Sequence, residues 1–173
     1  EKGINATVEI SKLINQIIQL ADSKSGTTVV PTVLQSGTTT NTVPEVATLD
    51  IDCRSFEMKQ LQRIDSEIRK LQSSSAKVEV AGAINRPPLE EQNSKQLFEI
   101  LNNKLKSVGK SEVLSAAVGG GSDGNLAAAA GAQVLDGLGA VGHGAHAKTE
   151  HILKSKIESQ IEMAKLLIQE LCK

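Results

Sequence analysis

Hydrophobic positions in the first half of the chain repeat with two different periods. Where they recur every three or four residues they predict amphipathic helices, and where β-branched residues gather they predict strands. The predicted elements are a helix over 4–21, strands over 27–35 and 45–54, a helix over 56–71 with Ser55 as N-cap, and a strand over 77–83. This α-β-β-α-β order resembles an α+β split βαβ sandwich, ferredoxin-like, that lacks its first strand.

The segment Asn85-Arg86-Pro87-Pro88 interrupts the pattern and predicts a boundary between two domains, 1–84 and 85–173. Helical and strand-like segments alternate beyond it. The predicted elements are a helix over 94–108, a strand over 113–118, a short helix over 124–131, a strand over 133–135 and a long helix over 149–171. Such alternation favours a parallel α/β layer, here too small to be a whole domain.

Composition narrows the function classes. The chain has 173 residues, 39% hydrophobic and 23% charged, with a net charge of -1 and only two aromatic residues. Interspersed charges and missing aromatic platforms argue against nucleic acid and anionic membrane as partners, and no apolar run approaches the ~20 residues of a membrane span. Two distant cysteines favour a reduced, cytoplasmic protein. The start at Glu1, almost directly in a helix, predicts a piece of a longer protein.

A glycine-rich loop at 119–124 has the spacing G-x-G-x-x-G between a predicted strand and a predicted helix. One interpretation is a nucleotide site with phosphate at the helix N-terminus. The following helix is short, however, and Asp136 comes earlier than a ribose-binding acid usually does. The other interpretation is a tight strand-to-helix connection, with Asp123 as the cap of the helix.

A second glycine-rich loop, 137–144, leads to His146 and Glu150, which are four residues apart, with Glu150 opening the last predicted helix. A neutral imidazole is a good zinc ligand. His143, His146 and His151 could form a site by themselves, but His143 lies in a flexible glycine loop and no other ligand-rich segment is present to complete a coordination shell. His146 is the candidate ligand, because the small residues around it allow a metal and a substrate to approach closely.

Three polar residues outside these loops are candidates for binding a carboxylate. Arg54 follows the second predicted strand, Asn41 lies in the polar loop before that strand, and Arg86 lies at the domain boundary. A guanidinium binds a carboxylate through two hydrogen bonds, and an amide can add a further one. The alternative is that each arginine is simply a solvated surface residue.

Read together, these segments resemble the zinc aminoacylase and carboxypeptidase family, which includes the carboxypeptidase G, acetylornithine deacetylase, succinyl-diaminopimelate desuccinylase and peptidase T types. They occur in the family's order and cover nearly all of the chain. The matching segments are Gly3–Ala6, Asn41–Pro44, Asp50–Arg54, Gly119–Asn125, Asp136–Gly139 and His146–Glu150.

The resemblance implies a catalytic α/β domain that holds two metal ions, usually zinc, and a lid domain that mediates dimerisation. Residues 1–84 would be the lid without its first strand, and residues 85–173 the C-terminal part of the catalytic domain. His146 matches the last metal ligand. The substrate-binding positions would be Asn41, Arg54 and Arg86 for a terminal carboxylate and Gly120, Gly121 and Ser122 as a pocket lining.

The family's other metal ligands, its glutamate general base and a lid histidine have no counterpart in this sequence, and His143 stands where glycine is typical. The resemblance therefore implies part of a homodimeric, metal-dependent hydrolase that cleaves amide bonds of peptides or N-acyl amino acids with a free carboxylate. This chain alone is expected to be inactive. The alternative is a stand-alone dimerisation or binding module, which would leave the glycine loops and His146 unexplained.

Overall fold

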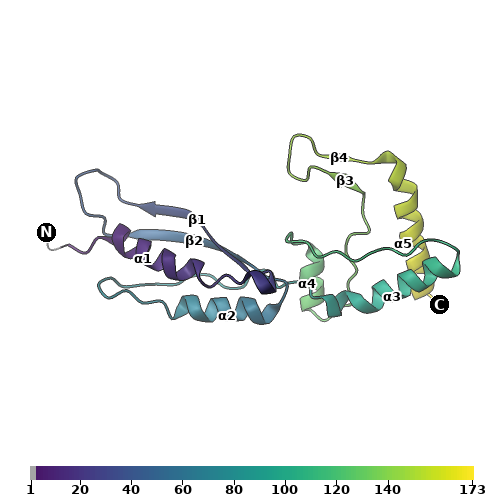
Figure 1. The fold of residues 1–173 in the computed structure, drawn as a ribbon, viewed down its shortest axis with the longest axis horizontal. Coiled ribbons are helices and arrows are strands. Elements are labelled where there is room, and N and C mark those ends of the chain that lie inside the picture. The colour runs from purple at the N-terminus through teal and green to yellow at the C-terminus, as the bar shows by residue number, and fades with distance from the viewer. Residues whose placement is uncertain (1–2) are drawn as a thin grey trace. The chain divides into compact units, whose positions relative to one another are not determined.

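The computed structural model describes residues 3–173 and divides into two compact units, Glu1–Pro88 and Leu89–Lys173 (Figure 1). Each unit has its own hydrophobic core. No helix within residues 3–173 is both long and apolar enough to cross a membrane.

The first unit consists of a two-stranded sheet and two helices. Helix α1 (Ala6–Ile18) is followed by β1 (Thr28–Ser36), β2 (Ala47–Arg54) and α2 (Met58–Arg69). A short 3-10 turn, Ser23–Ser25, precedes β1. Helix α1 begins where the sequence places a capping residue: the Asn5 side chain accepts hydrogen bonds from the backbone N–H groups of Thr7 and Val8.

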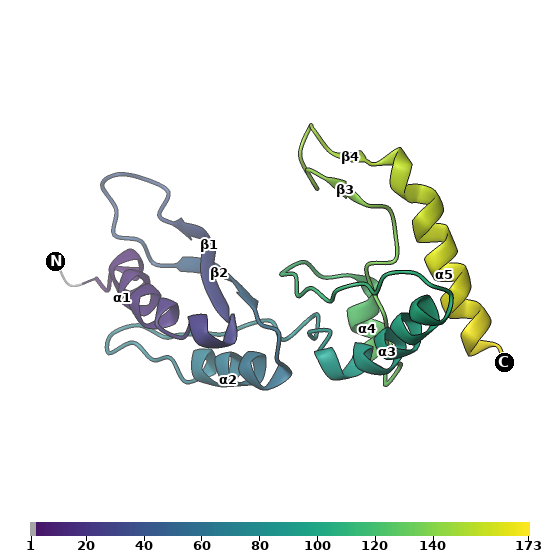
Figure 2. The ribbon, with the colours of Figure 1, turned by 45° about the vertical axis from the view of Figure 1, so that its right-hand side comes forward.

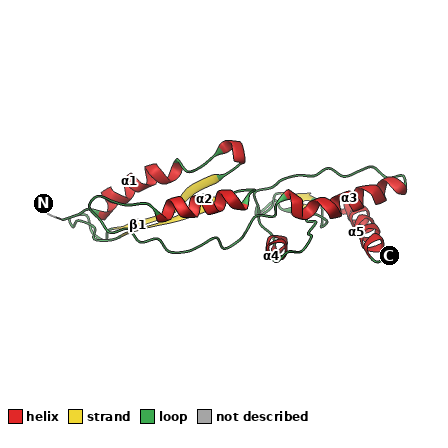
Figure 3. Cartoon of the chain, turned by 90° about the horizontal axis from the view of Figure 1, so that it is seen from below, coloured by secondary structure: helices red, strands yellow, loops and turns green. Residues whose placement is uncertain are grey.

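The two strands pair antiparallel, from Thr28 opposite Arg54 to Ser36 opposite Ala47, with an irregular register between Pro31 and Val33. Both helices pack against the hairpin through one buried cluster (Figure 3). Its buried members are Leu13, Ile17, Val29 and Ile64, and the inward residues of β2 pack against them. The hydrophobic stripe of α2 faces this core, whereas that of the first helix does so through Leu13 and Ile17 and leaves Val8 and Ile18 exposed.

The predicted strand over 77–83 is wrong. Val78 packs against the core and Val80 is half-buried, while Lys77 and Glu79 are exposed, so this segment has the alternation of a strand. The sheet of this unit nevertheless contains only β1 and β2. An extended segment becomes a strand only when a neighbour supplies ladder hydrogen bonds, and within residues 3–173 none does so here.

The predicted N-cap of α2 is also wrong, by two residues. The helix begins at Met58 with Glu57 in the capping position. Ser55 lies two residues earlier, where its Oγ accepts a 3.2 Å hydrogen bond from the Glu57 N–H. Ser55 thereby shapes the turn that leads into the helix rather than the first helical turn itself.

The second unit is organised around two helices, α3 (Glu91–Ser107) and α5 (Ile157–Leu171), which pack together (Figure 2). Between them lie α4 (Asp123–Ala129) and the two-residue strands β3 (Gly142–His143) and β4 (His151–Ile152). A 3-10 turn, Lys154–Lys156, precedes α5. The buried centre is formed by Leu101, Leu105 and Leu167.

The predicted strands over 113–118 and 133–135 are wrong as well. Helix α3 holds both segments: Asn102 binds the backbone N–H and C=O of Val113, and the Asn93 carbonyl accepts from the Val134 N–H. Neither segment belongs to a sheet in residues 89–173, where the only sheet is β3–β4. The chain is therefore a mixed helix and sheet protein of the α+β class, and the described part of its second unit has no parallel layer.

The last helix begins at Ile157, later than the predicted residue 149, because the residues before it form other elements. His151 and Ile152 form β4, and Lys154–Lys156 form the 3-10 turn. Glu150 consequently lies in the loop between β3 and β4 and does not open the helix. The four-residue spacing of His146 and Glu150 is not a helical spacing.

Candidate functional site

The first glycine loop ends in a capping box at α4. Ser122, rather than the predicted Asp123, is the N-cap: its Oγ accepts a 3.1 Å hydrogen bond from the Gly124 N–H. In return, the Asn125 side chain accepts a 2.9 Å hydrogen bond from the Ser122 N–H. Asp123 is the first helical residue, where a negative charge is favoured by the helix dipole. This reciprocal arrangement satisfies N–H groups at both ends of the first turn.

Ser122 also connects the two glycine loops. Its Oγ donates a 2.6 Å hydrogen bond to Asp136 Oδ2, and the Gly137 N–H donates to Asp136 Oδ1 at 2.8 Å. These hydrogen bonds, the one from Ser122 foremost, lower the pKa of Asp136 below its ordinary value. A Cβ at Gly124 would lie 3.0 Å from Val134 Cγ1, so the glycine permits close packing. A tight connection into α4, without a strand directly before it, thus accounts for Ser122, Gly124 and Asp136 without a nucleotide.

The second candidate segment is the hairpin formed by β3 and β4, which stands apart from α4 in both ribbon views (Figures 1 and 2). Gly142 pairs with Ile152, and His143 pairs with His151. A side chain at Gly142 would collide with the His151 carbonyl oxygen, so the backbones can approach only because this residue is glycine. The Leu153 N–H donates to the Val141 carbonyl at 2.8 Å and extends the pairing.

His146 lies in the loop of this hairpin and has an unusual backbone conformation. Its φ is +64°, the only positive value at a non-glycine residue within 3–173. The left-handed region costs roughly 1–2 kcal/mol for a residue with a Cβ. Two turns hold it there: Ala147 donates to the Gly144 carbonyl, and Glu150 donates to the Ala147 carbonyl. The imidazole is exposed on a loop whose backbone is fixed.

The residues present do not by themselves fit a zinc ion. Among residues 3–173, no group of three or more His, Cys, Asp or Glu side chains is placed to hold a metal. His143 and His151 face each other, but His146 is on a separate turn of the loop. His146 could therefore supply one ligand to a metal, and the remaining ligands would have to come from other residues.

The three predicted carboxylate-binding residues are all exposed and all belong to the first unit. Asn41 lies in the loop between β1 and β2, Arg54 is the last residue of β2, and Arg86 lies in the segment after the core. Arg54 Nε donates a 2.7 Å hydrogen bond to Asp52 Oδ2, and the side chain is 59% exposed. The carboxylate of Asp52 thus orients the guanidinium on the surface of the strand.

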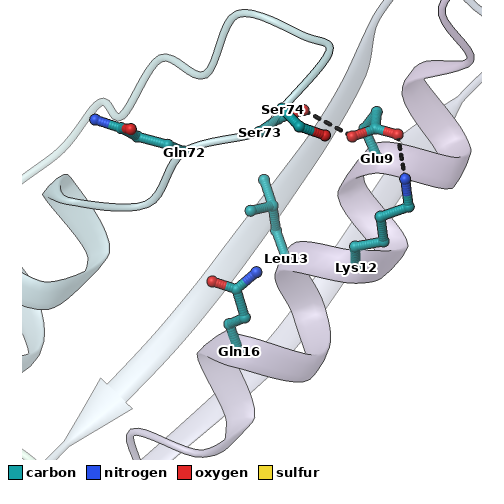
Figure 4. A pocket seen from close by; sticks show the side chains of 7 residues that line it. All are labelled: Glu9, Lys12, Leu13, Gln16, Gln72, Ser73 and Ser74. Atoms are coloured by element: carbon teal, nitrogen blue, oxygen red, sulfur yellow. Dashed lines mark hydrogen bonds and ion pairs between the residues drawn. The ribbon is translucent and has the colours of Figure 1, made fainter.

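Sequence reasoning missed a cavity of about 240 Å³ between α1 and residues 72–74 (Figure 4). The largely buried Glu9 lies at one side of it, where Lys12 Nζ donates to Oε1 at 2.5 Å and Ser73 Oγ donates to Oε2 at 2.7 Å. These two bonds lower the pKa of Glu9. A sequence signal existed: Glu9 is four residues before Leu13 and so lies on the buried face of the helix.

Comparisons with known proteins extend over both units. Residues 1–80 match the family model of the peptidase dimerisation domain. Over 99% of its length the chain is 28% identical to carboxypeptidase G2 from Pseudomonas sp. (strain RS-16), of which it covers 43%. The structure is similar to aminopeptidase PepT from Bacillus cereus ATCC 10987, with a TM-score of 0.76 and 22% identity over 99% of this chain and 47% of that one. The chain thus spans less than half the length of these relatives.

Proposed function

We propose that this chain is part of a metal-dependent amide hydrolase, because residues 1–80 match the model of the peptidase dimerisation domain and the chain is 28% identical to carboxypeptidase G2. Its substrates are peptides or N-acyl amino acids with a free carboxylate. The observation that carries the proposal is the match to carboxypeptidase G2 along 99% of the chain, which includes both units.

In this proposal residues 1–84 are the lid and dimerisation domain, and residues 85–173 are the C-terminal part of the catalytic domain. Support comes from the segments 77–83, 113–118 and 133–135, whose sequences predict strands but which pair with no strand of the described chain. A strand needs a neighbour for its ladder hydrogen bonds. We therefore assign their partner strands to polypeptide other than residues 1–173. A split βαβ domain places such a strand between β2 and 77–83.

His146 is proposed as one ligand of a two-zinc centre. Its left-handed backbone, held by two turns, is the kind of strain that accumulates at functional sites. When bound, zinc supplies Lewis-acid polarisation of the scissile carbonyl and an activated water. The role of His146 is to present its imidazole on a fixed loop. One histidine does not hold zinc tightly, so the chain alone is inactive.

Substrate binding is proposed for the remaining candidate residues. Arg54, oriented by Asp52, and Asn41 bind the substrate carboxylate, and Arg86 is a further carboxylate-binding residue. The loop Gly120-Gly121-Ser122 lines the substrate pocket, where the capping box and the bond to Asp136 fix its position. A rigid loop holds a substrate in place with little loss of entropy on binding.

A homodimer through the first unit is also proposed. Val30, Val33 and Leu34 on β1 are each between 45% and 49% exposed, an apolar group that burial in a partner would stabilise. The outer edge of β1 has no strand beside it among residues 3–173. Both features favour association of two β1 strands from different copies. The proposed location of the enzyme is the cytoplasm, in keeping with its two distant cysteines.

The proposal is tested on the chain alone and on a longer polypeptide that includes the coding sequence before Glu1. After dialysis, the chain alone should retain no stoichiometric zinc and should not hydrolyse N-acyl amino acids. The longer protein should retain stoichiometric zinc and should hydrolyse N-acyl amino acids. His146→Asn in the longer protein should abolish hydrolysis. Stoichiometric zinc with turnover in the chain alone would overturn its inactivity, and full activity of the longer His146→Asn protein would overturn the ligand role.

A second function, a dimerisation module without catalysis, is favoured by one observation: the first unit has its own buried core and matches a dimerisation domain by itself. The two proposals differ in what residues 89–173 do. If the longer protein shows no hydrolase activity and residues 1–88 dimerise as the whole chain does, the module interpretation is correct.

A further inference from the structure

Two histidines face each other across the hairpin at the base of the His146 loop. His143 of β3 lies directly opposite His151 of β4 in the antiparallel ladder. Directly opposite residues project to the same face of a sheet, with Cβ atoms about 4.5–5.5 Å apart. Their ring centroids are 5.8 Å apart and the ring planes are inclined by 55°. The rings are therefore neighbours without being stacked in parallel.

This separation suits a shared metal ion. Metal–nitrogen bonds of imidazole are about 2.0–2.1 Å long, which places the centres of two rings on one ion roughly 5–6 Å apart. Both side chains are exposed, so water can complete the coordination shell.

A hydrogen bond prepares one of the rings for this role. His151 Nδ1 lies 2.8 Å from the Thr149 carbonyl oxygen. A carbonyl oxygen only accepts, so Nδ1 of the neutral ring is the protonated donor, and Nε2 keeps its lone pair. Metal-binding histidines usually donate their other ring N–H to a carbonyl or carboxylate in this way, which fixes the tautomer and the ring orientation.

The backbone under the pair is also fixed. Gly142 allows the two strands to approach more closely than any side chain would permit, and Gly144 has a φ of +74° at the turn out of β3. The Leu153 N–H bond to Val141 closes the hairpin on the other side of the pair. Preorganised ligands lose less entropy when they bind.

We propose that His143 and His151 form a two-histidine chelate for a late first-row divalent cation such as Ni²⁺, Cu²⁺ or Zn²⁺. The chelate consists of His143 and His151 and does not include His146. Two imidazoles and water give weaker binding than a three- or four-ligand zinc site, so dialysis removes the ion. Affinity should follow the usual order for nitrogen ligands, in which Cu²⁺ exceeds Ni²⁺ and Zn²⁺.

The test is a calorimetric titration of NiCl₂ into the untagged chain at pH 7.5. Ni²⁺ is chosen because Cu²⁺ oxidises thiols, and Cys172→Ser is the background because this cysteine is exposed. Burial raises the pKa of the Cys53 thiol, which keeps it protonated and a poor competitor. We expect one Ni²⁺ per chain.

Substitutions then locate the ion. His143→Asn and His151→Asn should each weaken binding at least about tenfold, since even outer partners of metal ligands cost about 10–100-fold. Lys148→Gln, at an exposed position in the loop of the same hairpin, is the matched control and should bind as the parent does. Unchanged binding in the His143→Asn/His151→Asn double variant, or an equal loss in Lys148→Gln, overturns the proposal.

Nuclear magnetic resonance on the unsubstituted hairpin gives an independent readout. Ring nitrogen shifts should show His151 protonated at Nδ1 before any metal is added. Substoichiometric Ni²⁺ should broaden the His143 and His151 ring signals more than those of His146. The opposite tautomer, or broadening centred on His146, overturns the proposal even if a substitution disturbs the hairpin. Hydrolase activity is not measured, so this result is independent of the proposed function.

Discussion

Ser122 Oγ both accepts from the Gly124 N–H and donates to Asp136 Oδ2, at 3.1 and 2.6 Å respectively. One hydroxyl therefore caps α4 and ties together two loops that are fourteen residues apart. Neither bond alone would fix the loop at 120–122. Together they fix the start of α4 and hold Asp136 beside it.

Ser122→Ala removes both bonds and should lower the free energy of unfolding of the second unit by about 1–2 kcal/mol, the usual cost of losing a helix cap. Ser122→Thr keeps the hydroxyl and should cost much less. Urea denaturation followed by circular dichroism measures both. An Ala variant as stable as the parent would show that the capping box does not hold this loop.

Glu9 should make the first unit sensitive to acid. Hydrogen bonds from Lys12 and Ser73 lower the pKa of its carboxyl in the folded state. The unfolded chain therefore binds a proton at a higher pH than the folded chain does. The stabilisation is present above the ordinary pKa of about 4.3 and is lost as the pH falls through the lowered folded value.

Glu9→Gln should flatten this dependence: its melting temperature should fall less than that of the parent between about pH 5 and pH 3. Melting curves in that range measure the difference. Glu45→Gln, at an exposed position in the loop between β1 and β2, is the control. Equal slopes for the parent and Glu9→Gln would contradict the assignment.

Ile64 is 1% exposed at the centre of the first core. Ile64→Ala leaves a cavity and should cost about 2–5 kcal/mol of unfolding free energy. Ile161→Ala, where the side chain is 50% exposed, should change stability by less than about 0.5 kcal/mol. Denaturant unfolding compares the two, and similar costs would mean that the core is misplaced.

Gly142→Ala should open the β3–β4 hairpin, because a Cβ there collides with the His151 carbonyl oxygen. The helices should remain, so far-UV circular dichroism stays almost unchanged while the histidine signals shift. At Gly139 an added Cβ meets nothing within 4 Å, which makes Gly139→Ala the matched control. Unshifted histidine signals in Gly142→Ala would rule out the close pairing.

Leu34→Lys should weaken the proposed dimer, since it puts a charge in the exposed apolar group of β1. Sedimentation equilibrium should show a higher dissociation constant for this variant. Leu114→Lys, in the second unit where the side chain is 94% exposed, should leave the association unchanged. A dimer weakened only by Leu114→Lys would place the interface elsewhere.

The helices could be predicted because their pattern is local. Each amphipathic stripe faces a core in its own unit, and α1 even begins at the capping residue Asn5. The segments 77–83, 113–118 and 133–135 were predicted as strands from their local sequence, but strand pairing depends on a distant neighbour. Ser122 and Asp123 can both cap a helix. Ser122 is the N-cap because Asn125, three residues later, completes a capping box with it.

The sequence predicted which residue types form the candidate site, but it did not predict their backbone conformation. Histidine in a glycine-rich loop suggested a metal ligand, but the left-handed backbone of His146 depends on turns formed by Gly144, Ala147 and Glu150. The pairing of His143 with His151 depends on the β3–β4 hairpin. The sequence did not predict this hairpin, because residues 149–171 were predicted to be helical. The assignment of Asn41, Arg54 and Arg86 to a carboxylate stays a prediction.

The open backbone of residues 113–118 has a practical consequence. Leu114 and Val118 are 94% and 72% exposed on a stretch of chain whose hydrogen-bonding groups no strand in the described structure covers. Such an edge pairs readily with any similar edge it meets. At high concentration the isolated polypeptide should therefore form β-rich aggregates, and a solubilising charge in this stretch should be the first remedy in preparing it.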